Sequence, residues 1–443
     1  MRKTIFISSY HSLISRNILQ AEILNILTKK NFRVVILVFP SKVKYFDDNF
    51  KKENIEIVGI KPKESFLDSW IYFISVSLVS VENLFVGGLL NQKMYFKFYL
   101  AHLIHYIFAK FFISKTILKF IAGVLVKKNT YSGLFEKYKP NLVFSTDIYD
   151  TSDRELIKEA KKYGIATVGM VRSWDNVTTK GVMLAVPDKI IVPNEILKDE
   201  LQEYNKINPD KISISGIPHY DGCVMPRKIS REEFFKKMHL DPGKKLILFS
   251  PAGSILYKHD GEVLKLFQEF KSRNVFSKKV QFLVRFPPTD TISLDGFGGD
   301  PEFVLDQPGV NISGVKKESE LTKEGAEHLN DSLYYSDIVI TLTSTMAIDA
   351  AVFDKPAIIF SIKRNKSDDI KKFLKYTHYR KFIDFKFCKL AISKSELVKY
   401  INEYLKNSNL DKGKRSELVK KYCYKLDGNS SMRVAKVLLE SIH

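Results

Sequence analysis

Short apolar runs rich in Val and Ile alternate with longer helix-like stretches along most of the chain, and this alternation constrains the fold more than any other feature. Such runs are typical of strands that are buried on both faces of a sheet. Alternating strands and helices predict a parallel sheet covered by helices on both faces. The strands predicted in the first half are Thr4–Ser8, Arg33–Val38, Ile55–Ile60, Leu142–Ser145, Ala166–Val171, Lys189–Val192 and Ile212–Ser215.

The second half repeats the pattern, and 443 residues are enough for two or three domains. The strands predicted there are Lys245–Ser250, Gln281–Phe286, Asn311–Ser313, Asp337–Leu342 and Pro356–Ser361. Pro218, Gly222 and Pro226 punctuate the chain between the halves, which places an N-terminal domain at 1–220 and a C-terminal domain at 221–443. The predicted fold class is α/β, with two doubly wound, Rossmann-like domains facing a cleft where ligands bind beyond the strand ends.

Residues 66–128 depart from this pattern, because they are apolar, aromatic and helical without strand or turn signals. They contain two acids, Asp68 and Glu82, against seven Lys. We expect a helical insertion in the N-terminal domain that rests on an anionic membrane surface. A transmembrane span and a buried hairpin or oligomer contact remain alternatives. The lysines expected beside the membrane are Lys93, Lys97, Lys110, Lys115 and Lys119.

The composition narrows the classes of partner. Lys and Arg number 70 against 50 Asp and Glu, a formal net charge of +20 that favours polyanions such as nucleic acid, anionic lipid or phosphorylated substrates. A Lys-rich solvated surface is the simpler alternative. The three cysteines, Cys223, Cys388 and Cys423, have no metal-ligand or disulfide spacing. The cysteines fit a reducing cytosol, so we predict a cytoplasmic protein. No constellation of metal ligands is recognisable in the sequence, and we expect no metal and no cofactor.

The stretch "TLTSTMAIDAAVFDKPAIIF" (341–360) carries the clearest ligand signal. Thr343 follows the predicted strand Asp337–Leu342, and Ser344 or Thr345 can cap the following helix. The start of a helix offers N–H groups and a positive dipole end to a phosphate. Asp349, about one turn further on, can accept hydrogen bonds from ribose hydroxyls. An ordinary strand–helix–strand unit with a surface Asp is the alternative.

This stretch resembles the nucleotide-binding segment of GT-B glycosyltransferases, of UDP-N-acetylglucosamine 2-epimerases and of the glycerophosphotransferases that polymerise teichoic acid. Asp349 matches the acid of that segment, and Ser344 and Thr345 match its phosphate-facing positions. The run "SGIPHYD" (215–221) resembles the connection between the two domains of these proteins. "DGNSSMRVAKVLLESI" near the C-terminus resembles their last helix, which packs back toward the N-terminal domain.

The stretch "RSWDNVTTKG" (172–181) follows a predicted strand and contains more polar and charged side chains than a connecting loop needs. The matching loop of the teichoic acid polymerases reads roughly Trp-His-Gly-Thr-Pro-x-Lys, and its His is proposed as the base. Trp174 and Lys180 keep their places, and Asp175 stands where that His would be. A carboxylate can also act as a general base. The residues that would then bind substrate are Arg172, Trp174, Asn176 and Lys180. The alternative is that the stretch is only a hydrogen-bonded turn after the strand.

Several weaker candidates follow other predicted strands. His11 is a candidate base and Arg16 an anion contact in "SYHSLISRN", with a polar helix start as the alternative. His378 and Arg380 in "YTHYRKF" are candidates for stacking or phosphate binding. The candidates for binding a donor diphosphate are Gly253, Ser254, Lys258 and Arg285.

The resemblance implies a metal-independent, inverting glycosyltransferase of bacterial polysaccharide biosynthesis. The expected donor is a nucleotide sugar, most simply UDP-linked. The expected acceptor is a lipid-linked or growing glycan at the inner face of the cell membrane. A CDP-glycerol-type glycerophosphotransferase and a UDP-sugar 2-epimerase are alternative enzymes, while a nucleotide-binding or nucleic-acid-binding protein is the alternative without catalysis. No nucleic-acid-binding module is recognisable, so no nucleic-acid partner is expected.

Overall fold

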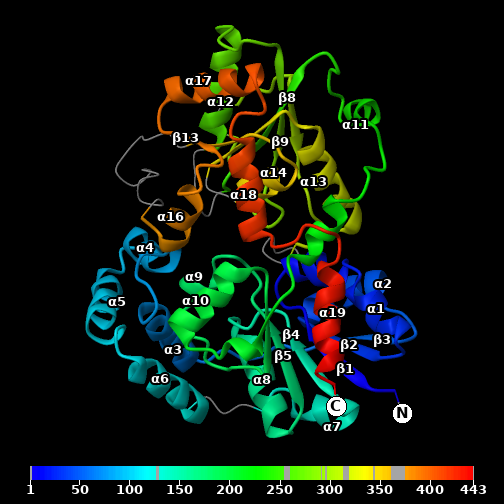
Figure 1. Ribbon diagram of the computed structural model, residues 1–443, viewed down its shortest axis with the longest axis vertical. Coiled ribbons are helices and arrows are strands. Elements are labelled where there is room, and N and C mark those ends of the chain that lie inside the picture. Colours follow the sequence, from blue (N-terminus) through cyan, green and yellow to red (C-terminus); the bar gives the residue numbers. More distant parts are fainter. Residues whose placement is uncertain are drawn as a thin grey trace. The chain divides into compact units, whose positions relative to one another are not determined.

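The computed structural model describes residues 2–125, 129–253, 260–290, 292–294, 297–312, 319–342, 345–360 and 375–442. The chain forms two compact units, shown in Figure 1. The first comprises Met1–Gly222, Tyr376–His378 and Lys421–His443, and the second comprises Cys223–Lys375 and Tyr379–Lys420. Each unit contains a parallel sheet flanked by helices, which confirms the predicted α/β class.

The sheet of the first unit has the order β3-β2-β1-β4-β5-β6-β7, and every neighbouring pair is parallel. The chain order reverses at β1, whose neighbours are β2 and β4, and ligands of such sheets bind at the carboxyl ends beside this reversal. The predicted strands agree with the observed ones within about one residue at each end. The strands are β1 (Thr4–Ser8), β2 (Arg33–Val38), β3 (Ile55–Gly59), β4 (Leu142–Ser145), β5 (Ala166–Met170), β6 (Lys189–Val192) and β7 (Ile212–Ile214).

Helices cover both faces of this sheet, and separate apolar clusters of described residues pack against the two faces. Ile5 and Ile7 point into one cluster, whereas Phe6 points into the other, as alternation along a strand requires. The helical elements, apart from the insertion and the last helix, are η1 (Ser15–Leu19), α1 (Ile23–Lys29), η2 (Pro40–Lys42), α2 (Val43–Phe50), α7 (Ser132–Tyr138), α8 (Thr151–Lys162), α9 (Asn176–Thr179), α10 (Glu195–Asn205), η3 (Pro209–Lys211) and η4 (Pro218–Cys223).

The last helix, α19 (Ser430–Glu440), belongs to the first unit and lies beside α1 (Figure 1). Its Val434 and Leu438 join the same apolar cluster as Ile5. The Asp221 carboxylate caps the start of this helix. It accepts hydrogen bonds from the backbone N–H groups of Ser430 (2.9 Å) and Ser431 (2.7 Å). The acid of the "SGIPHYD" run therefore acts as a helix cap.

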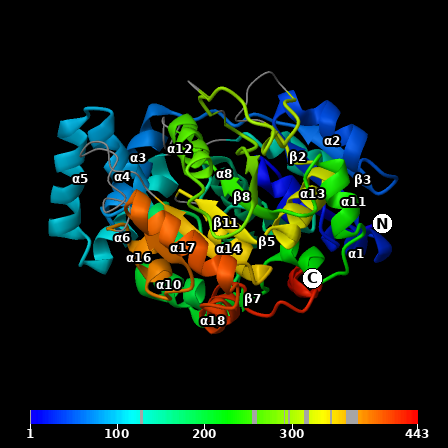
Figure 2. The same ribbon diagram turned by 90° about the horizontal axis from the view of Figure 1, so that it is seen from above.

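The insertion consists of α3 (Phe66–Ser77), α4 (Leu84–Asn91), α5 (Tyr95–Phe108) and α6 (Phe112–Leu125). Figure 2 shows α5 on the outer side of α3 and α4. A buried ion pair of 2.5 Å joins Asp68 of α3 to Arg154 of α8. No helix within the described residues combines the length and the apolar character that crossing a membrane requires.

Two lysines of α6 point inward, toward the end of α10. Lys115 donates to the carbonyl of Tyr204 (2.9 Å) and Lys119 to that of Asn205 (3.4 Å). These carbonyls lie in the last turn of α10, where a helix lacks internal donors and favours cations. Burial lowers the pKa of both lysines. The prediction that Lys115 and Lys119 lie beside a membrane is therefore wrong.

The sheet of the second unit has the order β10-β9-β8-β11-β12-β13, again with parallel neighbours. The prediction of a strand at 311–313 is wrong for Asn311 and Ile312, and Ser313 lies outside the described residues. The edge strand is formed earlier, by Phe303–Asp306, and Val310 makes only an isolated bridge to Glu320. The strands are β8 (Lys245–Ser250), β9 (Val280–Arg285), β10 (Phe303–Asp306), β11 (Ile338–Thr341), β12 (Ala357–Phe360) and β13 (Lys389–Ala391).

One large apolar cluster, containing Phe249, Phe267 and Phe282, packs against this sheet. The three rings contact one another in series, with centroids 5.3 Å and 4.9 Å apart. The helices in this part of the chain are α11 (Arg231–Lys237), α12 (Asp260–Ser272), α13 (Lys323–Tyr335), α14 (Met346–Val352), α16 (Thr377–Ile383), α17 (Lys394–Lys406) and α18 (Lys412–Tyr422).

Candidate active site at the carboxyl ends of the first sheet

A buried ion pair lies where β4 and β5 end. Arg172 Nε is 2.6 Å from Asp147 Oδ2, with side chains 10% and 6% exposed. Burial alone would raise the pKa of Asp147, but the charge of Arg172 and its hydrogen bond hold that pKa below its usual value. Asn176 Nδ2 lies 3.5 Å from the other carboxylate oxygen. The structure thus brings Arg172 and Asn176 together around an acid that the sequence analysis missed, although Asp147 also follows a predicted strand.

The loop after β5 is organised around Asp175. Its carboxylate accepts hydrogen bonds from the hydroxyls of Ser173 (2.5 Å) and Thr179 (3.2 Å), and its carbonyl accepts the N–H of Thr179 (3.0 Å). Burial and the charges of Asp147 and Asp175 raise the pKa of Tyr72 to about 12, so a protonated phenol lies near both acids. The loop is a hydrogen-bonded turn, and that turn holds a half-buried carboxylate in a defined orientation.

Gly181 ends this loop in a left-handed conformation with φ +87°. A Cβ at this position would lie 2.6 Å from the backbone of Ser75, so a larger residue could not pass α3 here. Val182 then donates to the Ser75 carbonyl (3.2 Å). The loop is thereby fastened to the helical insertion.

His378 reaches the same loop from a distant part of the sequence. Its imidazole lies 5.4 Å from the Trp174 ring and is 4% exposed. Thr377 N–H donates to the Glu82 carbonyl (3.1 Å), which holds this short segment against the insertion. Burial lowers the pKa of His378, and the charge of Asp175 opposes that change. Arg380, the other candidate in this run, is exposed and belongs to the second unit.

The loop after β1 places His11 beside these charges. Burial and the charge of Arg172 lower the pKa of His11 to about 3, so the ring is neutral at physiological pH. Its Nδ1 lies 3.2 Å from the Leu13 N–H, which donates to it. The guanidinium of Arg16 lies 3.4 Å from His219 Nε2.

The candidates in the second unit have different surroundings. Gly253 N–H donates to Asp260 (3.0 Å). Arg285 is 4% exposed, forms an ion pair with Asp306 and donates to the Gly325 carbonyl (3.2 Å). Burial would raise the pKa of Asp306, but the hydrogen bond from His328 and the charge of Arg285 lower it. Arg285 of β9 therefore links the neighbouring strand β10 to the first turn of α13.

The structure describes only part of the segment that is predicted to bind the nucleotide. Thr345 precedes α14 and makes no side-chain cap, so of the two predicted capping residues only Ser344, outside the described part of the chain, stays a prediction. Asp349 lies in the first turn of α14 and is half-buried. Four further candidates lie outside the described residues: Ser254, Lys258, Thr343 and Ser344.

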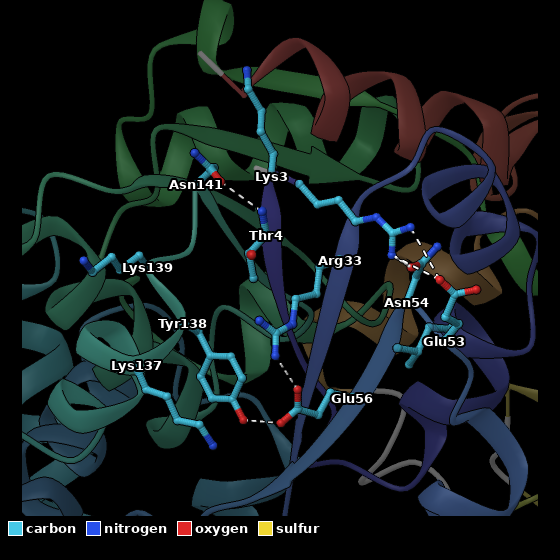
Figure 3. Close-up of a pocket in the computed structure, with 12 residues that line it drawn as sticks. Lys3, Thr4, Arg33, Glu53, Asn54, Glu56, Lys137, Tyr138, Lys139 and Asn141 are labelled. Carbon is cyan, nitrogen blue, oxygen red and sulfur yellow. Dashed lines mark hydrogen bonds and ion pairs between the residues drawn. The ribbon is translucent and has the colours of Figure 1, made fainter.

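A cavity of about 790 Å³ opens at the other edge of the first sheet, near the amino ends of β1 to β4 (Figure 3). Two of the cations that line it form ion pairs: Arg33 lies 2.6 Å from Glu56 and Arg2 lies 3.5 Å from Glu53. None of the predicted site residues lines it. Because functional loops of such sheets follow the carboxyl ends, we place the candidate site at the opposite edge.

Two parallel α/β units of this kind define the two-domain GT-B class of transferases and related enzymes. The chain belongs to the CDP-glycerol:poly(glycerophosphate) glycerophosphotransferase family, whose model matches residues 171–440. The match begins one residue before Arg172, at the loop that carries Asp175. The predicted family resemblance is therefore confirmed.

Solved structures share the fold at low sequence identity. The wall teichoic acid polymerase TagF has 13% identity and a TM-score of 0.54, covering 100% of this chain and 89% of that one. UDP-N-acetylglucosamine 2-epimerase from Methanocaldococcus jannaschii has 14% identity and a TM-score of 0.53, covering 99% and 100%. A glycosyltransferase from Rickettsia africae has 11% identity and a TM-score of 0.50, covering 99% of each chain. No curated protein sequence matches significantly.

Proposed function

We propose that the protein transfers a sugar from a nucleoside-diphosphate donor to a hydroxyl group of a bacterial cell-envelope glycan. The observation that carries this proposal is the half-buried Asp175 carboxylate at the end of β5, in the loop where the family match begins. Transfer of glycerophosphate from CDP-glycerol is the second candidate, because the family is named after that reaction.

In the proposed reaction, the acceptor oxygen attacks the anomeric carbon of the donor sugar. The bond from that carbon to the diphosphate oxygen breaks, and the nucleoside diphosphate leaves with the bonding electrons. Asp175 takes the acceptor proton as the new bond forms. The hydroxyls of Ser173 and Thr179 hold the carboxylate in place. We propose no metal ion and no cofactor in this step.

We further propose that Asp349, near the carboxyl edge of the second sheet, contacts the ribose of the donor. Calorimetric titration of UDP, CDP, GDP, dTDP and CDP-glycerol is expected to find a ligand. Asp349→Ala should weaken its binding by about 1.5–3 kcal/mol, the range for a hydrogen bond to a charged group. Glu417→Ala, at an exposed acid of the same unit, should leave the affinity unchanged. Equal affinity in the Asp349 variant would remove this site, and product analysis with each donor would separate sugar from glycerophosphate transfer.

The insertion supports a membrane-bound location for this reaction. Its two outer helices turn aromatic and aliphatic side chains outward: Phe96 is 75% exposed, Tyr106 80% and Phe120 71%. An apolar surface of this kind needs a partner. Exposed Lys93 and Lys110 flank it, a combination that suits an anionic lipid surface. The other exposed apolar residues of α5 and α6 are Tyr95, Tyr99, Leu103, Ile107, Phe108, Phe112, Ile113, Ile117, Ile121 and Val124.

We therefore expect the protein to float with lipid vesicles, more strongly with anionic than with neutral lipid, and to lose only part of this binding in high salt. The triple variant Phe96→Asp, Tyr106→Asp, Phe120→Asp should bind at least about tenfold less, because three apolar side chains no longer leave water. Met432→Asp, at an exposed apolar residue of α19, is the control. Light scattering without lipid tests the alternative: a parent dimer that the triple variant converts to a monomer would assign this face to protein contact.

A further inference from the structure

Helix α3 of the insertion contacts the loop that follows β5. The Ser75 carbonyl accepts the N–H of Val182 (3.2 Å), and a Cβ at Gly181 would lie 2.6 Å from the Ser75 backbone. Tyr72 lies three residues before Ser75, so these two residues share one face of the helix. The face of α3 that carries Tyr72 is therefore the face that meets the loop of the candidate site.

The insertion holds the Tyr72 side chain in one position. The ring packs edge to face against Phe85 of α4, with the ring centroids 5.2 Å apart. The Tyr72 carbonyl accepts a hydrogen bond from the Ser75 hydroxyl (2.8 Å). Helix α3 is in turn joined to α8 by the buried ion pair between Asp68 and Arg154. A ring that is held in this way loses little freedom when it contacts a substrate.

The hydroxyl group of Tyr72 is available to a ligand, because no group in the described part of the chain forms a hydrogen bond with it. The side chain is half-buried, and tyrosine hydroxyls that leave water usually have a hydrogen-bond partner. The charges of Asp147 and Asp175 both act on this phenol, so it lies near the ends of β4 and β5. Because its pKa is raised to about 12, the phenol stays protonated and can donate a hydrogen bond.

Asp175 takes the proton of the acceptor in the proposed reaction, so a hydrogen-bond donor near Asp175 meets the acceptor. We propose that Tyr72 binds the acceptor by donating a hydrogen bond to the oxygen next to the attacking hydroxyl group. This inference rests on the proposed function and adds that the acceptor carries two neighbouring oxygens, as a sugar or a polyol does. The family match begins at residue 171, so this contribution comes from an insertion outside the matched residues.

The test is the binding of simple polyhydroxy compounds in the absence of donor and turnover. Fluorotyrosine placed only at position 72 gives a single fluorine NMR signal from an atom beside the hydroxyl group. The compounds titrated are methyl β-glucoside, methyl β-galactoside, methyl β-N-acetylglucosaminide and glycerol. At least one of them is expected to shift this signal until it saturates. Fluorotyrosine placed instead at position 99, where Tyr99 is exposed on α5, should not respond.

Tyr72→Phe removes the hydroxyl group and keeps the ring. It should raise the dissociation constant of the responding compound about three- to tenfold, the range for one neutral hydrogen bond, as measured by saturation-transfer NMR. A monodeoxy analogue that lacks the partner oxygen should bind the parent more weakly but bind Tyr72→Phe as well as the full compound does. Tyr99→Phe is the matched control and should change nothing. Because the Tyr72 hydroxyl has no partner among the described residues, Tyr72→Phe should keep the urea midpoint of the parent.

A signal at position 72 that none of the compounds shifts would overturn the inference, as would equal affinity of the parent and Tyr72→Phe. A lower urea midpoint with unchanged affinity would assign the hydroxyl to stability alone. Each of these results leaves the proposed function intact as long as a nucleotide binds and Asp175→Asn loses turnover. Failure of every nucleotide to bind would instead count against the proposed function, whereas the signal at position 72 reports on the first unit by itself.

Discussion

Asp175→Asn is expected to lower turnover by about 10²–10⁴-fold while changing the dissociation constant of the donor nucleotide by no more than about twofold. Asparagine keeps the shape of the side chain. Ser173 and Thr179 donate to different carboxylate oxygens, so the single carbonyl oxygen of asparagine can keep one of these two hydrogen bonds. It cannot take a proton from the acceptor. Turnover is measured with the donor identified by titration, and nucleotide affinity by calorimetry.

Two variants of the same loop separate catalysis from structure. Ser173→Ala removes one hydrogen bond from the carboxylate but leaves its charge, so turnover should fall much less than in Asp175→Asn. Lys180→Ala should mainly raise the Michaelis constant for a phosphorylated acceptor. If Asp175→Asn retains the turnover of the parent, the residue serves only the hydrogen-bonded turn.

Asp147→Asn is expected to lower the free energy of unfolding of the first unit by about 3–5 kcal/mol, because it leaves the buried Arg172 guanidinium without its counter-charge. Both tryptophans lie in this unit, so tryptophan fluorescence during urea denaturation follows its unfolding. Glu440→Gln breaks an exposed ion pair with Lys436 and should cost less than about 1 kcal/mol. Equal urea midpoints for the parent and Asp147→Asn would contradict this prediction.

The same pair predicts an effect of pH. The pKa of Asp147 is lower in the folded protein than its usual value, so its contribution to stability is present above the unfolded pKa of about 4. That contribution is lost as the pH falls through the folded value. The stability difference between the parent and Asp147→Asn should therefore be largest near neutral pH and shrink in acid.

Strands buried on both faces were predictable from the sequence because their residue pattern is local. Arg33–Val38 and Lys245–Ser250 are continuous apolar runs, and their observed bounds match the predicted ones. The edge strand Phe303–Asp306 was missed because one face is partly exposed, so its four residues do not form such a run. The three residues of Lys389–Ala391 are too few for any period to show.

Individual side chains in the site were harder to predict. Asp175 and Arg172 could be found because they follow a clear strand within one short stretch. Asp147 also follows a strand, but its importance depends on β4 and β5 being neighbours in the sheet. His378 lies far away in sequence, and only the packing of its segment against the insertion brings it to Trp174.

The sequence by itself determined the α/β class, most of the strands, the family and the helical character of 66–128, because each depends on residue patterns within short stretches. Only the tertiary structure decided which face of each helix is buried and which distant groups meet. Lys115 and Lys119 share one face of α6 by helical spacing, yet that face turns inward because the end of α10 needs donors for its carbonyls. The aromatic side chains are consequently left on the outer surface, and this result depends on the neighbouring helix rather than on the sequence of α6.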